Sequence, residues 1–323
     1  MSLNKMEKAE IRIVGFCANC IERTYYPLFA KRYKNIVKQR NLRYAEKGKR
    51  AVLDLFYREN ADGNNTKKPL VFYIHGGGWV SGIKNIRQFY CYHWVDKGYV
   101  CANIDYDYSL AEKHPDHIRQ IFKALEFVLS KADELNVDTS RVVIAGESAG
   151  GHFAALVGAV TTHPEFYEEL GIDFRFKDTF KPAACLLLSG IYDPVRALGT
   201  KFPLIGVYTR AYFGAGRKEL RDGLPANVAD TAAPERYADS FFPPSFIIGS
   251  DKDRLMPESV SLYEKLQAAG VNSRYYLCKG INGLHAASLD SVHGKSGREC
   301  FALAEKFLTE VLEKQSALNH ALD

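Results

Sequence analysis

The chain has 323 residues, of which 46% are hydrophobic and 25% charged, and its formal net charge is +5. This is the composition of an ordinary globular protein, and a core of this size needs no disulfide or metal to hold it together. The positive charge is concentrated at residues 31–50, where nine Lys or Arg accompany only Glu46. No aromatic platform or nucleic-acid module goes with it, so we interpret it as a solvated helix face and expect no nucleic-acid partner.

Cysteine usage and hydropathy restrict the class of protein further. Seven cysteines are an odd number in a long chain, so a disulfide framework is not expected. Cys17 and Cys20 form a lone C-x-x-C pair, which we interpret as two reduced thiols beside a packed helix. The chain start is charged and lacks the long apolar stretch of a signal peptide, and no run of 18 apolar residues occurs. We therefore expect a cytoplasmic protein without a membrane partner, either a monomer or a homodimer.

The pattern of apolar residues predicts two kinds of structure in chain order. Residues 1–50 look polar and helical, with Phe29, Tyr33, Ile36 and Val37 on one stripe, and are predicted to form an N-terminal helical cap. From residue 51 to 323, strand-like and helix-like stretches alternate, which predicts an α/β domain with a mostly parallel sheet and helices on both faces. Strands are expected at 51–57, 70–74, 99–104, 141–145, 183–188, 245–248 and 273–278, and helices at 118–129, 149–160, 257–269 and 296–313. Residues 195–242 lack clean periodicity and are predicted to be an irregular insert that contributes to the cap.

A serine motif lies at one of the predicted strand-to-helix junctions. Residues 146–150 (GESAG) fit the pattern G-x-S-x-G, and a sharp turn at this junction presents a serine hydroxyl. The turn is strained and neighbouring backbones come close, which explains Gly146 and Gly150. We therefore predict that Ser148 is the nucleophile of a serine hydrolase.

A glycine-rich loop follows an earlier apolar strand. Residues 75–79 read HGGGW, and three consecutive glycines leave backbone N–H groups free to point at one oxygen. Acyl transfer needs such donors, because the tetrahedral intermediate carries negative charge on the former carbonyl oxygen. A phosphate-binding loop is excluded, since no Lys-Ser/Thr pair follows and no G-x-G-x-x-G opens a helix. The loop is predicted to be an oxyanion hole.

A serine nucleophile also needs a base and a carboxylate that orients the base, in the chain order serine, acid, histidine. Asp251 and Asp253 both follow the strand expected at 245–248, and we favour Asp253 because Asp251 lies almost within the strand's end. Asp193 is a third candidate, which we interpret as a capping or turn aspartate. The residues alone therefore leave Asp251 and Asp193 as alternatives to Asp253 for the acid.

Three histidines follow Asp253 in the sequence. His285 comes directly after a predicted strand and is favoured as the base, whereas His293 lies further along the loop and His320 in the tail. His152 is expected to be buried and structural, and Glu147 to make a buried hydrogen-bonded contact. No metal-ligand spacing such as H-E-x-x-H occurs, so no cofactor or metal is expected.

With these residues in place, the chain resembles the hormone-sensitive-lipase-like branch of α/β-hydrolase esterases, a group of bacterial acetyl esterases and carboxylesterases. The resemblance rests on residues 75–79 (HGGGW), 146–151 (GESAGG), 108–115 (YSLAEKHP) and 253–266 (DRLMPESVSLYEKL). It implies an α/β-hydrolase fold and oxyanion N–H groups from Gly77, Gly78 and Ala149. It also supports Asp253 and His285 as the acid and the base. The chain departs from the family pattern at Glu147, where an aspartate is usual.

The resemblance and the motifs together predict a serine carboxylesterase that hydrolyses short-chain, acetyl-like esters through an acyl-enzyme. The form H-G-G-x-W also resembles kynurenine formamidases, so hydrolysis of an N-formyl amide is the alternative. A catalytically inactive hydrolase fold that binds a partner is a further alternative. It is disfavoured because the serine, the histidine and the oxyanion glycines are all present.

Overall fold

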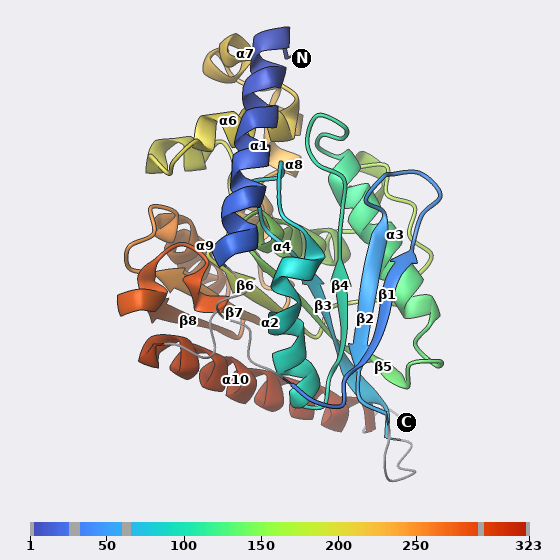
Figure 1. Cartoon of the computed structure of the whole chain (residues 1–323). Coiled ribbons are helices and arrows are strands. Elements are labelled where there is room, and N and C mark those ends of the chain that lie inside the picture. The colour runs from blue at the N-terminus through green and yellow to red at the C-terminus, as the bar shows by residue number, and fades with distance from the viewer. Residues whose placement is uncertain (1–2, 26–32, 60–65, 290–293, 321–323) are drawn as a thin grey trace.

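The computed structural model describes residues 3–25, 33–59, 66–289 and 294–320, with the backbone alone for 316–320 (Figure 1). Its strands are β1 (Val37–Arg43), β2 (Val52–Tyr57), β3 (Lys68–Ile74), β4 (Val100–Ile104), β5 (Val137–Glu147), β6 (Ala184–Leu188), β7 (Ser245–Ser250) and β8 (Ser273–Cys278). Its helices are α1 (Lys5–Tyr25), α2 (Lys84–Asp96), α3 (Asp116–Ser130), α4 (Ala149–Thr162), α5 (Glu165–Glu169), α6 (Ile205–Phe213), α7 (Arg217–Asp222), α8 (Ala226–Thr231), α9 (Met256–Ala268) and α10 (Lys295–His320). Short 3₁₀ helices lie at Arg196–Thr200, Pro234–Tyr237, Gly280–Gly283 and Ala287–Leu289.

The described strands form one sheet in the order β1-β2-β4-β3-β5-β6-β7-β8. The six strands β4-β3-β5-β6-β7-β8 are each parallel to their neighbours in this run, and β2 is antiparallel to both β1 and β4. Parallel strands are covered on both faces and therefore read as continuous apolar runs, as residues 70–74 do. The expected fold class, a mostly parallel sheet with helices on both faces, is confirmed. The carboxyl ends of the parallel strands meet at one edge, where such folds place their ligands.

Successive side chains of a strand point to opposite faces of the sheet, so each strand contributes to two cores. Leu70, Phe72 and Ile74 of β3 pack on the face that α3, α4 and α9 cover. Val71 and Tyr73 pack on the opposite face, against α2 and α10. All five side chains are fully buried. The two layers of helices hold β3 and β5 at the centre of the sheet, and this fixes the ends of both strands.

The helix expected over residues 1–50 is only partly present. Residues 37–43 form β1 instead, which pairs antiparallel with β2 at the edge of the sheet, with Val37 opposite Tyr57. Most β1 side chains are exposed, and the sequence VKQRNLR lacks the apolar alternation of a half-buried strand. The strand forms because its backbone pairs with β2, which no local pattern indicates. Tyr33 and Ile36 pack against the core below α2 and α10, and Phe29 lies outside the described residues.

The segment at 195–242 was expected to be irregular, but it contains the short helices α6, α7 and α8. Each spans between six and nine residues. Helices this short show too few turns for an apolar period to be recognised. Helix α6 packs on α1 through the contacts of Ile11 with Val207 and Ala211.

Three buried histidines should make the fold sensitive to acid. Burial lowers the pKa of His114 and of His117 to about 3, and that of His152 to about 4, from 6.5. Below pH 6.5 the unfolded chain then binds more protons than the folded protein. The stability that these histidines contribute is therefore fully present above pH 6.5, and it is lost as the pH falls toward their pKa values in the folded protein. Each histidine contributes a loss of up to about 1.4 kcal/mol per pH unit. The pKa values of Glu7 and Glu10 are lowered in the folded protein, so protonation of these two groups reduces stability only near and below their ordinary pKa of 4.5.

Urea unfolding at several pH values between 7 and 5 should therefore show a free energy of unfolding that decreases with acid. A His117→Phe variant should show a shallower slope by about one proton. An identical slope in the two proteins would contradict a neutral, buried His117.

Candidate active site

Ser148 lies at the sharp turn between β5 and α4. Its backbone has φ 54° and ψ −121°, an uncommon conformation for a residue other than glycine. The turn also brings backbones into close approach. A Cβ at Gly150 would overlap the carbonyl oxygen of Ile74, and one at Gly146 would overlap that of Gly150. The predicted need for glycine on both sides of Ser148 therefore has a steric cause.

The structure brings Ser148, His285 and Asp253 together from three separate segments. Nε2 of His285 lies 2.9 Å from Oγ of Ser148, and Nδ1 lies 2.7 Å from Oδ2 of Asp253. Oδ1 of Asp253 accepts the N–H of Leu255 at 2.9 Å, which orients the carboxylate. The side chain of Asp253 is fully buried and that of His285 is 26% exposed. Such a chain of hydrogen bonds lets the imidazole take the serine proton while the carboxylate holds the ring.

The other acid and base candidates lie elsewhere. Asp251 is exposed, and its carboxylate lies against Gly283. Oδ1 of Asp193 accepts the N–H groups of Val195 and Arg196, each at 3.0 Å, so Asp193 is the turn aspartate that the sequence indicated. His293 lies outside the described residues, and His320 is the last residue of α10.

The glycine-rich loop after β3 faces Ser148. Gly77 and Gly78 have φ values of 119° and 58°, and both line the same pocket as Ser148 and His285. Within the described part of the chain, the N–H groups of Gly77 and Gly78 donate to no protein acceptor. Ala149 is the first residue of α4, where an N–H has no partner within its own helix. All three donors are therefore available to a ligand.

A buried carboxylate ties the loop to the serine turn. Oε1 of Glu147 accepts the N–H of Gly76 at 2.7 Å, and Oε2 accepts the hydroxyl of Tyr73. The guanidinium of Arg87 on α2 pairs with the same carboxylate, and its Nη1 reaches Glu22 of α1 at 3.1 Å. The buried contact expected for Glu147 is confirmed, whereas Arg87 and Glu22 were missed. Arg87 shares a helix face with Tyr90 and Trp94. A charged residue on a face of large aromatic residues indicates a buried ion pair, and this was the signal in the sequence that could have identified Arg87.

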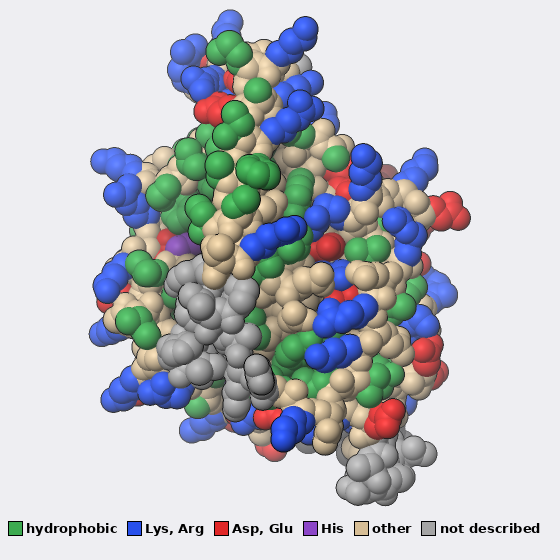
Figure 2. Space-filling model, in the orientation of Figure 1, with side chains coloured by type: hydrophobic (Ala, Val, Ile, Leu, Met, Phe, Trp, Pro, Cys, Tyr) green, Lys and Arg blue, Asp and Glu red, His purple; other side chains and the backbone are tan. Residues whose placement is uncertain are grey.

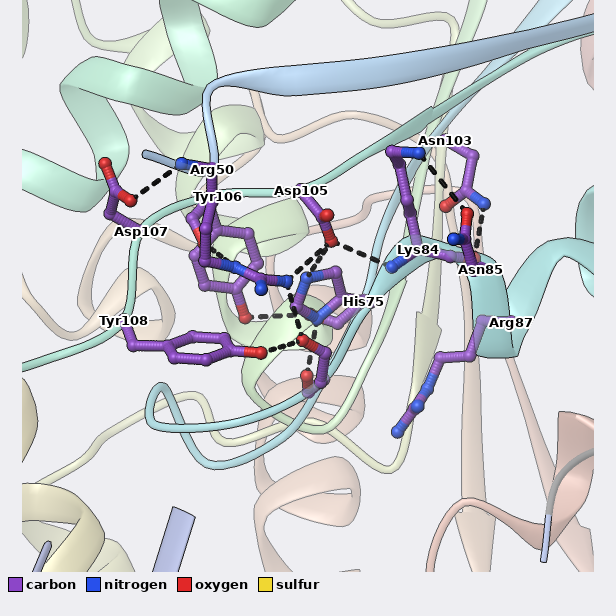
Figure 3. A network of polar contacts seen from close by, with 12 residues as sticks. Arg50, His75, Lys84, Asn85, Arg87, Asn103, Asp105, Tyr106, Asp107 and Tyr108 are labelled. Carbon is purple, nitrogen blue, oxygen red and sulfur yellow. Dashed lines mark hydrogen bonds and ion pairs between the residues drawn. The ribbon is translucent and has the colours of Figure 1, made fainter. Parts of the chain in front are cut away.

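A second polar network holds the outer side of the loop (Figure 3). Oδ1 of Asp105 accepts Nη2 of Arg50 at 2.9 Å and the backbone N–H of Lys84 at 2.8 Å. Nε2 of His75, the first residue of the loop, lies 3.2 Å from the same oxygen. Burial alone would raise the pKa of Asp105, but His75 and Arg50 outweigh it and hold the pKa below its ordinary value. The ionised Asp105 therefore anchors His75.

Arg50 fixes the far end of the loop. Its Nη2 donates to the carbonyl of Gly82 at 2.9 Å and its Nε to that of Tyr106 at 3.1 Å. The guanidinium also lies 4.1 Å over the ring of Tyr108, whose hydroxyl donates to Gly82 as well (Figure 3). The interpretation of residues 31–50 as a solvated helix face is therefore wrong, because this region holds β1 and a structural arginine.

The pocket in front of Ser148 has a volume of about 110 Å³. Two of its walls come from segments outside the sheet: Ala18 and Glu22 on α1, and Phe202 and Tyr208 near α6. The ring of Phe202 lies 4.7 Å from that of His285. The ring of Tyr208 covers Gly78 so closely that a Cβ there would lie 2.6 Å from it. These four residues were not found from the sequence, because their placement depends on how α1 and α6 pack.

Other candidate residues have structural places. His152 is fully buried, and its Nε2 lies 2.8 Å from the carbonyl of Ala232, as expected for a structural residue. Cys17 and Cys20 are free, exposed thiols on α1. Among the residues that the structure describes, no group of His, Cys, Asp or Glu is placed to hold a metal ion. Over the same residues, no helix combines the length and apolar character needed to cross a membrane.

Comparison with known proteins places the chain in a family. The family model described as BD-FAE matches residues 53–266. The chain belongs to the BD-FAE family. The matched range includes the loop at 75–79, Ser148 and Asp253, whereas His285 lies beyond it.

Two curated relatives come from Mycobacterium tuberculosis (strain ATCC 25618 / H37Rv). The probable carboxylic ester hydrolase LipM is 27% identical over 228 residues, which cover 70% of this chain and 50% of that protein. Esterase LipC is 27% identical over 265 residues, which cover 79% of this chain and 62% of that protein. The chain thus spans about half to three-fifths of the length of these relatives.

A solved structure shows that the fold extends over nearly the whole chain. Esterase B from Lactobacillus Rhamnosis (HN001) superposes with a TM-score of 0.84 and covers 98% of both chains, at 19% sequence identity. The α/β-hydrolase fold expected from the sequence is confirmed.

Proposed function

We propose that this BD-FAE family member is a serine carboxylesterase that hydrolyses short-chain acyl esters through an acyl-enzyme. One observation carries the proposal: the hydrogen-bond chain from Asp253 through His285 ends at Ser148, in the pocket that Gly77 and Gly78 also line. The relatives named a carboxylic ester hydrolase and esterases support the bond type.

The proposed reaction has two similar halves. His285 removes the proton of Ser148 as Oγ attacks the ester carbonyl, and Asp253 stabilises the imidazolium that forms. The N–H groups of Gly77, Gly78 and Ala149 bind the oxyanion. His285 then protonates the departing alcohol, and water attacks the acyl-enzyme in the same way to release the acid. General acid–base assistance of this kind contributes roughly a hundredfold to ten-thousandfold.

The size of the pocket supports a small acyl group. Sites for drug-sized ligands have volumes of roughly 300–1,000 Å³, whereas the space in front of Ser148 is about 110 Å³. Phe202 and Tyr208 close it on one side. A long acyl chain would need these rings to move, and a short one would not.

We also propose that α1 and the segment at 195–242 act together as a cap over the site. Both supply walls of the pocket. They are joined by ion pairs, since Arg210 of α6 reaches Glu10 of α1 at 2.7 Å and Glu7 at 3.4 Å. The cap therefore sets the shape of the acyl pocket, whereas the sheet edge holds the reacting groups.

Specificity constants measured across a series of p-nitrophenyl esters test the proposed substrate class. We expect the largest kcat/KM for acetyl to butyryl esters and a decrease of at least about tenfold for medium chains, because each misfitting methylene is felt in a closed pocket. N-formylkynurenine and an acetylated sugar belong in the same series. A kcat/KM for N-formylkynurenine above those of all the esters would transfer the function to the formamidase alternative.

A Gly78→Ala variant tests the oxyanion loop. The added Cβ would meet the Tyr208 ring at 2.6 Å and sits at a positive φ, so the loop must shift and misplace its donors. We expect kcat to fall by about a hundredfold or more. Gly98→Ala is the matched control, because Gly98 also has a positive φ (89°) but has no atoms within 4 Å of its Cβ position. Equal activity losses in the two variants would argue against a role for Gly78 beyond strain.

A further inference from the structure

Most of the exposed large apolar side chains lie on α1 or next in sequence to residues of the pocket segments. Nine such side chains occur among the described residues, and four of them (Met6, Ile13, Phe16 and Ile21) lie on α1. Leu204 lies between the pocket residues Phe202 and Tyr208, and Leu284 directly precedes His285. Scattered exposed apolar residues need no explanation, but a group of them on one helix indicates a binding surface.

The apolar residues of α1 form one continuous face. Met6, Ile13 and Cys20 recur at seven-residue spacing, and Phe16 lies one turn from Ile13, so all four point to the same side. Ile13 is 64% exposed and Phe16 is 70% exposed. Figure 2 shows hydrophobic side chains along the outward side of this helix, with Lys and Arg beside them.

The inward side of α1 is fixed to the body of the protein. Ile11 is buried against Val80 and α6, and a Cβ at Gly15 would lie 2.6 Å from the carbonyl oxygen of Val80. The N–H of Gly82 donates to Asn19 at 2.9 Å. The outward apolar face is therefore held in place while the inward face is packed.

The acidic residues of α1 are paired with arginines, whereas its basic residues are exposed. Its three acidic residues form ion pairs: Glu7 with Arg210, Glu10 with Arg210 and Arg217, and Glu22 with Arg87. Its basic residues Lys5, Lys8, Arg12 and Arg23 are exposed. The exposed side of the helix thus presents apolar side chains and positive charges, and the charge of its one acidic residue, Glu10, is neutralised by Arg210 and Arg217.

We propose that α1 is an interfacial helix that docks the protein on an anionic lipid surface. Helices that lie in a lipid–water interface combine an apolar face that enters the acyl boundary with Lys and Arg that meet anionic headgroups. The expectation of no membrane partner rested on the absence of a spanning segment, a criterion that does not test for one-sided helices. A second copy of the chain fits this face less well, because a symmetric contact would oppose like positive charges.

Docking through α1 would place the opening of the pocket next to the lipid. Ala18 and Glu22 belong to α1 and line the pocket. The exposed Leu204 and Leu284 are close in sequence to the lining residues Phe202 and His285. Apolar esters dissolved in the interface would then reach Ser148 without crossing bulk water. Lipid binding is independent of the proposed reaction, since it needs neither Ser148 nor His285.

Co-flotation with vesicles tests the proposal in a Ser148→Ala background, so that a failure of catalysis cannot be mistaken for a failure of binding. We expect binding to vesicles of phosphatidylcholine with phosphatidylglycerol, weaker binding to phosphatidylcholine alone, and weakening by salt. Combining Ile13→Gln with Phe16→Gln should reduce partitioning by about tenfold or more. Combining Lys5→Glu with Arg12→Glu, which flank this face, should do the same on the anionic vesicles only.

Two control variants lie at the opposite edge of the sheet. Phe241 is 72% exposed and precedes β7, and Lys181 is exposed and precedes β6. Phe241→Gln and Lys181→Glu should leave vesicle binding unchanged, and thermal unfolding confirms that every variant is folded. Equal partitioning of the Ile13/Phe16 variant and its parent would overturn the proposal. A dimer in sedimentation velocity that the same change abolishes, without vesicle binding, would assign the face to a second copy instead.

Discussion

Replacing Ser148 with alanine should lower kcat for p-nitrophenyl acetate by about a millionfold, to the level of background hydrolysis. Loss of the nucleophile in a serine hydrolase removes nearly all of the contribution of the triad, because the other members act only through it. Among the described residues, the side chain hydrogen-bonds only to Nε2 of His285, so the fold should survive its removal. Steady-state rates with purified protein, followed to long times, give the measurement.

A second substitution separates chemistry from strain. Ser148 has a positive φ of 54°, and glycine adopts this conformation without the cost that alanine bears. Ser148→Gly should therefore be as inactive as Ser148→Ala, with a thermal unfolding temperature equal to or above that of the parent. Turnover retained by either variant would show that another residue is the nucleophile.

Asp253→Asn should reduce kcat by about ten-thousandfold, the second largest effect that we expect. The carboxylate accepts the N–H of Nδ1 at 2.7 Å, which leaves Nε2 free to accept the proton of Ser148. An amide in its place can present N–H to the ring and favour the wrong tautomer, and it cannot stabilise the imidazolium. The bond from Leu255 to Oδ1 can persist, so the side chain should keep its position.

Asp251→Asn and Asp193→Asn are the matched controls for this change. Asp251 is exposed, and Asp193 caps a turn through Val195 and Arg196. Both variants should keep kcat within about threefold of the parent, because neither carboxylate bonds to His285 in the described structure. A larger loss in Asp251→Asn than in Asp253→Asn would transfer the role of the acid to Asp251.

The central sheet and the serine turn could be predicted because their signals are local. Residues 70–74 and 141–145 are uninterrupted apolar runs, and the motif at 146–150 needs its glycines to make the turn. Asp253 and Asp251 are only two residues apart. The sequence favours Asp253, but it does not show which of the two carboxylates points toward the histidine. The direction of the turn after β7 makes Asp253 the partner of His285, because this turn buries Asp253 and leaves Asp251 exposed.

The remaining parts depend on tertiary contacts. Strand β1 is polar and was expected to be helical, but its pairing with β2 determines its structure. The ion pair of Arg87 with Glu147 joins residues 60 positions apart, and no local pattern indicates it. Tyr208 reaches the pocket only because α6 packs on α1. Substrate preference is set by these contacts, which is why the sequence predicted the reacting groups more sharply than the acyl pocket.

The acyl-enzyme mechanism is tested most directly by labelling with a fluorophosphonate ester, followed by mass spectrometry of the digested protein. The hydrogen bond of Ser148 to His285 and the free donors of the oxyanion loop predict one adduct per chain, on the peptide that contains Ser148. Labelling should stop in the Ser148→Ala variant and should slow strongly in Asp253→Asn. An active parent protein that gains no adduct, or gains it on another residue, would contradict the assignment of Ser148 as the nucleophile.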